Sequence, residues 1–266
     1  MAKERFTTCP SCEQRYDRLL LRCPHCHEAN NDRSKTRMTF LPIPHQISLF
    51  LIGLIGLNVL SVIISIIAAV TIKEDDPLKY LLINSCSYSI LFITDLSVIN
   101  KYYYELLDPF KKGRTYIAGL VGFAFLLGGS LLISYLMSLM VPSAGTGENQ
   151  SVAIAMVLRN PAVAILILGI IGPFVEECAY RLGLFSLCKR ASRVLAYAVT
   201  TIVFATIHLN FFSGNIVDEL VALPDYLFAG LMFSLLYDFE GFGASLIAHI
   251  GNNLFSIISI IITKGQ

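Results

Sequence analysis

The sequence predicts an all-α, multi-pass membrane protein with about seven transmembrane helices and a small N-terminal zinc ribbon. Of its 266 residues, 55% are hydrophobic and only 15% are charged, and the mean hydropathy is +0.66. A typical soluble domain has about 25% charged residues. The apolar residues form runs near the roughly 20 residues that span a bilayer. Four of the seven cysteines lie within residues 9–26, before the first of these runs.

The cysteine-rich segment consists of two Cys-x-x-Cys pairs. Cys9 and Cys12 lie in "CPSC", and Cys23 and Cys26 lie in "CPHC" after ten intervening residues. Two such pairs joined by a short hairpin present four thiolates tetrahedrally, which is the ligand set of a structural zinc ion. A module this small can hardly bury a core, so we expect the zinc to provide most of its folding free energy. A redox-active cysteine pair is the alternative.

Histidines and charge bear on the partners of this zinc ribbon. His25 or His27 can replace one cysteine as a zinc ligand, although four cysteines suffice. A four-cysteine site leaves no open coordination position, so we expect the ribbon to bind a cytoplasmic protein partner rather than to catalyse a reaction. Nucleic acid is not expected as a partner, because acidic residues offset many of the basic ones and the net charge of the chain is only +1.

Seven apolar segments follow the zinc ribbon. We expect these transmembrane helices at residues 46–72, 78–99, 115–141, 161–187, 194–213, 220–238 and 243–263, with a short interfacial helix at 151–158. Lys and Arg residues concentrate in the N-terminal region and in the loops after the second and fourth segments. Because cytoplasmic loops of membrane proteins are enriched in these residues, we expect the N-terminus in the cytoplasm.

Charged residues interrupt the fourth segment, in the run "EECAYR". Residues four apart share a helix face, so Glu177 and Arg181 can form an ion pair, whereas Glu176 points elsewhere and lacks a partner on its own helix. Each ionised group near the bilayer centre costs about 2.5–3.5 kcal/mol on insertion scales, so such residues are usually functional. A carboxylate without an ion-pair partner can serve as a general base. The sequence therefore predicts different roles for the two glutamates.

Two later segments each carry a histidine. In "FATIH", Phe204 precedes His208 by about one helical turn, and in "HIGNN", His249 precedes Asn253 in the same way. A single intramembrane histidine is usually a packing residue. Two of them, together with Glu176 and the asparagine, predict one polar site that three segments share.

The motifs "EECAYR", "FATIH" and "HIGNN" resemble, in order and separation, the EExxxR, FxxxH and HxxxN pattern of the CPBP intramembrane proteases. This family includes CAAX prenyl proteases and bacteriocin-processing (Abi) proteins. The resemblance covers about residues 160–256 and implies an intramembrane endopeptidase, which acts on CAAX-type or other membrane-associated peptides. It divides the chain into a ribbon and linker at 1–40, three helices within 46–145, and a protease core at 150–263.

The resemblance also implies roles for individual residues. Glu176 matches the glutamate that activates a water molecule, and His208 matches the histidine that holds or deprotonates that water. His249 and Asn253 match the pair that contacts the scissile carbonyl and stabilises the oxyanion. The supporting positions are matched by Glu177, Arg181 and Phe204.

The mechanism and the functional class have alternatives. Glu176 with His208 and His249 is also a hydrolytic zinc ligand set, but the helical His-Glu-x-x-His pattern is absent, so we favour a metal-free site. Cys178 is disfavoured as a nucleophile, because it diverges from Glu176 around the helix. A catalytically inactive scaffold that recruits a partner through the zinc ribbon, and a transporter or proton relay, are the other classes.

Two further expectations concern position. Asp225 follows Pro224, so we expect it in the first turn of a helix, where an acid is favourable. The protease hypothesis places the reaction near the cytoplasmic side of the membrane.

Overall fold

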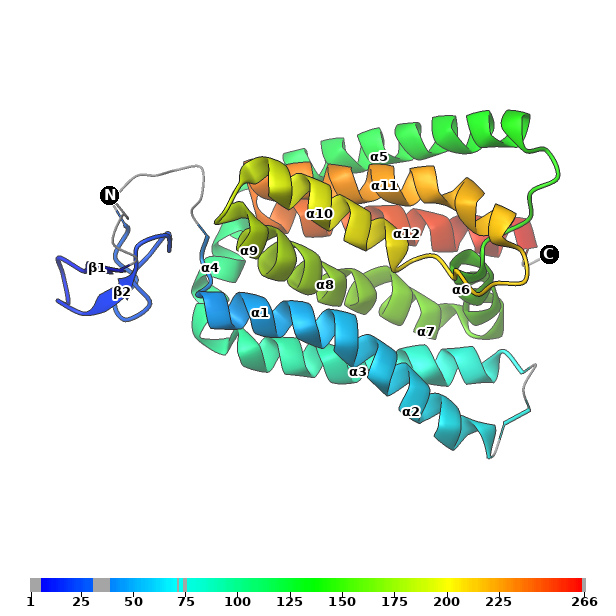
Figure 1. Cartoon of the computed structure of the whole chain (residues 1–266), viewed down its shortest axis with the longest axis horizontal. Helices are drawn as coiled ribbons and strands as arrows, with labels where there is room; N and C mark the ends of the chain where they lie inside the picture. The colour runs from blue at the N-terminus through cyan, green and yellow to red at the C-terminus, as the bar shows by residue number, and fades with distance from the viewer. Residues whose placement is uncertain (1–5, 31–38, 71, 74–75, 265–266) are drawn as a thin grey trace.

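The computed structural model describes residues 6–30, 39–70, 72–73 and 76–264, and it is mostly helical (Figure 1). Long helices run side by side in a bundle, and the cysteine-rich module lies at one end of this bundle (Figure 1). The architecture confirms the predicted multi-pass, all-α membrane protein with a small N-terminal cysteine module.

The N-terminal module is built on a two-stranded antiparallel hairpin. Strand β1 (Phe6–Thr8) pairs with β2 (Arg15–Asp17), and Thr7 lies opposite Tyr16. The buried side chains of the module form a small cluster of Cys9, Tyr16, Leu20 and Cys23. So few buried apolar groups offset little of the entropy lost on folding, which is why modules of this size usually need a metal or disulfides.

The first half of the bundle follows the module. Its helices are α1 (Ile43–Leu51), the π-helical residues Ile52–Gly56, α2 (Leu57–Ala69), α3 (Leu78–Val98), α4 (Tyr103–Leu107) and α5 (Gly113–Met140). Two 3₁₀ turns, Asn100–Tyr102 and Asp108–Lys111, flank α4.

The second half contains one long helix with two π-helical interruptions. The separate helix α6 (Glu148–Arg159) precedes it. The long helix consists of α7 (Pro161–Leu166), the π-helical residues Ile167–Ile171, α8 (Gly172–Glu177), the π-helical residues Cys178–Phe185 and α9 (Ser186–Lys189). Helices α10 (Arg193–Thr206), α11 (Ile216–Glu240) and α12 (Phe242–Lys264) complete the bundle.

Six helical spans within the described residues are long and apolar enough to cross a membrane. They are Ile43–Ala69, Leu78–Val98, Gly113–Met140, Pro161–Lys189, Ile216–Glu240 and Phe242–Thr263. The segment expected at 194–213 is the shorter helix α10, which has 14 residues against the roughly 20 that a full crossing needs. A helix is present as α6 where a short one is expected at 151–158.

The span Pro161–Lys189 is the central helix of the bundle. In its apolar 18-residue stretch, 50% of the residues are buried, against 6–28% in the corresponding stretches of the other spans. Small residues let α1 and the π-helical residues Ile52–Gly56 approach its backbone: a Cβ atom on Gly183 would lie 2.9 Å from the backbone N of Phe50. A Cβ atom on Gly53 would lie only 2.2 Å from the Cβ of Ala179. Close approach at small residues is typical of packed transmembrane helices.

Arg190, in the turn after α9, joins the N-terminal module to the bundle. Its Nη1 lies 2.9 Å from Asp17 Oδ2 in the module, and its Nε donates to Gln46 Oε1 in α1 at 3.0 Å. A second contact joins His27 Nδ1 of the module to Glu105 Oε1 in α4 at 2.9 Å. Polar contacts from two sides therefore hold the module against the end of the central helix.

Helix α11 contains Pro224 in its interior. The expectation that Asp225 lies in the first turn of a helix is therefore wrong, and the first-turn acids of α11 are Asp218 and Glu219. A proline is tolerated inside a transmembrane helix, because neighbouring groups satisfy the backbone carbonyl that its missing N–H leaves free.

Candidate active site

Glu176 lies at the point where three predicted motif segments meet. Its Oε2 is 3.7 Å from Nε2 of His208, in the turn after α10, and 3.6 Å from Nε2 of His249, in α12. Its Oε1 accepts a hydrogen bond from the hydroxyl of Tyr88 in α3 at 3.0 Å. The structure therefore brings together one carboxylate and two imidazoles from segments far apart in the sequence, as the motifs predict.

Hydrogen bonds determine which ring nitrogen of each histidine faces Glu176. His208 Nδ1 lies 2.6 Å from the carbonyl oxygen of Phe204. That oxygen can only accept, so Nδ1 carries the hydrogen. His249 Nδ1 donates to Glu177 Oε1 at 2.9 Å. When the imidazoles are neutral, both Nε2 atoms therefore present lone pairs to the carboxylate, and three acceptors face one another.

Glu177 is fully buried and supports His249 rather than facing the same space as Glu176. Besides the bond from His249, its Oε2 accepts the Ser245 hydroxyl at 2.5 Å, and its Oε1 lies 3.2 Å from Arg181 Nη1. The Glu177–Arg181 pair agrees with the predicted ion pair along one helix face. A buried carboxylate needs such compensation, because its desolvation is expensive.

Two phenylalanine rings connect Arg181 to the histidines. The Arg181 guanidinium carbon lies 4.7 Å from the ring centroid of Phe204 and 5.1 Å from that of Phe233. Phe204 in turn lies 4.6 Å from the His208 ring, and Phe233 stacks on His249 at 4.2 Å. These contacts hold both imidazole planes on a packed aromatic layer, and they place Phe204 beside the site as predicted.

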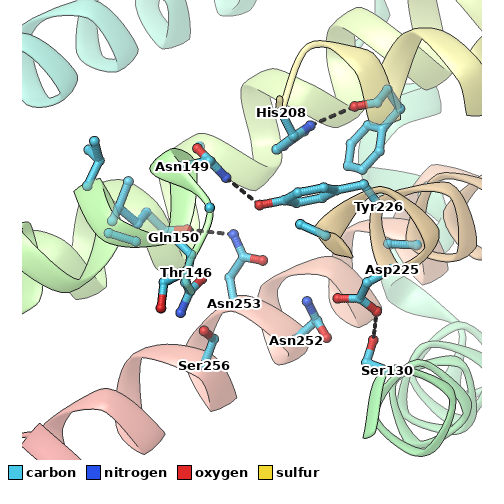
Figure 2. A pocket seen from close by; sticks show the side chains of 18 of the residues that line it. Ser130, Thr146, Asn149, Gln150, His208, Asp225, Tyr226, Asn252, Asn253 and Ser256 are labelled. Atoms are coloured by element: carbon cyan, nitrogen blue, oxygen red, sulfur yellow. Dashed lines mark hydrogen bonds between the residues drawn. The ribbon is translucent and has the colours of Figure 1, made fainter. Parts of the chain in front are cut away.

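Asn253 lines the same cavity but does not contact Glu176. Its side-chain Nδ2 donates to the carbonyl oxygen of Leu168 at 2.9 Å, within the π-helical residues Ile167–Ile171. Figure 2 shows its amide pointing into the cavity, as does the amide of the neighbouring Asn252. An amide nitrogen has two hydrogens, so one remains available to a ligand.

A cavity of about 860 Å³ adjoins Glu176 and both histidines. It is walled by α3, α5, α6, α11 and α12 and reaches the loop at 141–147, at the end of the bundle opposite the cysteine module (Figure 1). The cavity therefore extends away from the module, toward the end of the bundle that the predicted orientation places outside the cytoplasm. The depth of the cavity allows water to reach polar groups that would otherwise be enclosed by lipid.

Three residues at this site were not expected from the sequence. Tyr88 contacts Glu176 directly, and Tyr226 stacks on His208 at 4.8 Å while its hydroxyl accepts the Asn149 amide at 3.0 Å. Ser245 lies one helical turn before His249, so helix periodicity alone could have placed it beside the histidine. Nothing in the local sequence distinguishes the two tyrosines.

The N-terminal cysteines form a separate candidate metal site. The four Sγ atoms of Cys9, Cys12, Cys23 and Cys26 lie within 4.8 Å of one another, and no other such group occurs among the described residues. Tetrahedral zinc with bonds of about 2.3 Å places its sulfur ligands about 3.8 Å apart. The cluster can therefore hold a metal ion such as zinc. His27 points elsewhere, to Glu105, and is not needed as a ligand.

The backbone of this cluster repeats itself. The N–H of Glu13 donates to the carbonyl of Cys9, and the N–H of His27 donates to the carbonyl of Cys23. Both donor residues adopt left-handed φ angles, 59° and 60°. Desolvation opposes ionisation of the Cys9 thiol, but hydrogen bonds from backbone N–H groups, including that of Cys12, outweigh it and lower its pKa to about 7. A thiol so tuned is ready to bind a metal as thiolate.

Comparison with known proteins agrees with the site. The family described as type II CAAX prenyl endopeptidase Rce1-like matches residues 158–255, which contain all three motifs. No curated protein and no solved structure matches the chain. The similarity to this family over residues 158–255 is consistent with the CPBP protease motifs and leaves residues 1–157 outside the match.

Proposed function

We propose that the protein is an intramembrane endopeptidase in which Glu176 activates a water molecule. The observation that carries this proposal is the position of the Glu176 carboxylate, within 3.7 Å of Nε2 of both His208 and His249. Three acceptors around one point suit a water molecule, which can donate two hydrogens. Such a water is poised to lose a proton to a neighbouring base.

The proposed reaction is hydrolysis of a peptide bond. The water oxygen attacks the scissile carbonyl carbon as a water proton passes to Glu176, and His208 orients the water through Nε2. The C–N bond then breaks, and the proton held by Glu176 passes to the leaving amine. Each proton is thus returned, and the carboxylate is regenerated.

Negative charge that develops on the carbonyl oxygen needs donors. We assign this role to His249 and Asn253. His249 can donate through Nε2 only as an imidazolium, because Nδ1 already donates to Glu177. Ser245 and Arg181 keep the Glu177 carboxylate in place against His249 Nδ1. Asn253 contributes the amide hydrogen that is not bonded to Leu168.

Two metal questions belong to the proposal. We propose that the cysteine cluster binds one structural zinc ion and that Glu176 acts without a metal. The second statement is supported by ligand spacing, because in the described part of the chain only the four cysteines bring three or more ligand atoms all within 4.8 Å of one another. We also propose that the N-terminus lies in the cytoplasm, because residues 1–37 are rich in Lys and Arg.

The test compares cleavage of membrane peptides by the wild type and by Glu176→Gln in proteoliposomes. The probes are a farnesylated CAAX-type peptide and an unlipidated membrane-spanning peptide, and the products are identified by mass spectrometry. Glu240→Gln is the matched control, because Glu240 pairs with Arg114 outside the site. Cleavage that disappears only in Glu176→Gln supports the proposal. Equal cleavage by the wild type and Glu176→Gln, or no cleavage by the wild type, contradicts it and favours a scaffold.

A further inference from the structure

The cavity beside Glu176 is acidic. Its lining among the described residues includes the carboxylates of Glu176, Asp218 and Asp225 but no lysine or arginine. Asp218 has a structural role, because its Oδ1 accepts the backbone N–H of Gly145 at 2.6 Å and its Oδ2 accepts the Asn215 amide at 2.8 Å. Asp225 is therefore the lining carboxylate with neither a catalytic assignment nor a backbone partner.

Asp225 faces the cavity from α11 (Figure 2). Its Oδ1 accepts a hydrogen bond from the Ser130 hydroxyl of α5 at 2.5 Å, and the described residues provide no cationic partner for it. A hydroxyl is a neutral donor and cannot balance a negative charge. Because charges inside a membrane protein are expensive and normally paired, this carboxylate is suited to a cation that arrives with a ligand.

The rise of α11 gives the separation along the helix between Asp225 and the residue that contacts His249. Phe233, two turns farther along this helix, stacks on His249. Eight helical residues rise about 12 Å. An extended peptide advances about 3.3 Å per residue, so this distance corresponds to about three or four substrate residues. Tyr226 stacks on His208 and fixes the adjoining part of α11 against the site.

We propose that Asp225 binds a lysine or arginine side chain of the substrate, located about three or four residues from the scissile bond. The inference rests on the proposed protease function and assigns a substrate class to it. The cation pairs with the Asp225 carboxylate, and its methylene stem packs along the apolar walls of the cavity. Asp225 is then a residue that determines specificity, at a distance from the bond that breaks.

Binding is measured on the full-length Glu176→Gln protein in nanodiscs of neutral lipid, so that the result does not depend on cleavage. The probes are fluorescent apolar peptides that differ at one position, Lys, Gln or Glu, and this position is moved along the peptide. At one position we expect the Lys peptide to bind about tenfold more tightly than the Gln peptide, as a charged hydrogen bond provides. The Glu peptide is expected to bind more weakly than both.

Two added substitutions separate charge from packing. Asp225→Asn keeps the shape of the side chain and the Ser130 contact. It is expected to bring the ratio of the affinities for the Lys and Gln peptides close to one. Ser130→Ala removes the hydroxyl but keeps the carboxylate, so the ratio is expected to persist. Equal binding of the Lys and Gln peptides at every position, absence of binding by all probes, or a preference that survives Asp225→Asn overturns the proposal.

Cleavage by the wild type distinguishes the proposal that Asp225 binds a basic side chain from the proposed protease function on which it rests. The substrate is a peptide library prepared with a glutamate-specific protease, and the cut sites are read by mass spectrometry. Cut sites enriched in Lys or Arg three or four residues away support both proposals. Cleavage without this enrichment overturns the substrate class and leaves the protease standing. A Lys preference in binding without any cleavage overturns the protease instead.

Discussion

The contact between Tyr88 and Glu176 makes a sharp prediction about pH dependence. The Tyr88 hydroxyl donates to Glu176 Oε1 at 3.0 Å, while its ring packs against Gly172. Tyr88→Phe keeps the ring and removes only this donor. A hydrogen bond to a charged group contributes about 1.5–3 kcal/mol, and 1.36 kcal/mol corresponds to one pH unit. We therefore expect the acidic limb of the kcat/KM profile to move about one to two pH units upward.

The assay is the rate of cleavage of a fluorogenic peptide by reconstituted protein across the pH range. In the proposed reaction ionised Glu176 is the base, so a carboxylate that loses a donor becomes harder to ionise and activity is lost earlier on acidification. Tyr180→Phe is the matched control, because Tyr180 is buried beside the same cavity and no hydrogen bond joins its hydroxyl to Glu176. An acidic limb that stays in place in Tyr88→Phe, or that moves equally in both variants, refutes the reasoning.

Three other predictions concern stability and metal content. Glu177→Gln leaves the buried Arg181 without its anion, and loss of one member of a buried pair costs about 3–5 kcal/mol; an unchanged thermal unfolding temperature in detergent would contradict this. Cys12→Ser is expected to remove the zinc, from one ion per chain in the wild type to none by elemental analysis, and full retention would show that the cysteines are not the ligands. Arg190→Ala is expected to increase amide hydrogen exchange in residues 6–30. Arg193→Ala, which removes contacts to Asp238 and Phe239 in the bundle, is expected to leave that exchange unchanged.

The polar residues of the candidate site could be predicted from the sequence, because residues about four apart on a helix share a face. Glu177 and Arg181 pair as residues four apart should. The three motifs converge because each lies on, or at the end of, an apolar helix that packs in the same bundle. Ser245 follows the same rule and could have been found. Tyr88 could not, because its contact with Glu176 depends on how α3 packs against α8, which no local pattern encodes.

Two expectations failed for identifiable physical reasons. A proline followed by an acid usually marks the start of a helix, yet Pro224 lies inside α11, where tertiary packing compensates for its missing N–H. The segment at 194–213 is mostly apolar, but its helix ends at Thr206, and His208 lies in the turn that follows. Hydropathy therefore reports that a segment is apolar without reporting where its helix ends.

The orientation of the two imidazoles determines the order in which water and the peptide substrate bind in the proposed reaction. While both imidazoles are neutral, each Nδ1 hydrogen is committed to its own acceptor and the space in front of Glu176 is surrounded by lone pairs. A peptide carbonyl oxygen entering that space first would be repelled, since it too carries only lone pairs. Water therefore has to bind before the peptide, because the carbonyl oxygen of a peptide that enters a dehydrated site meets only hydrogen-bond acceptors.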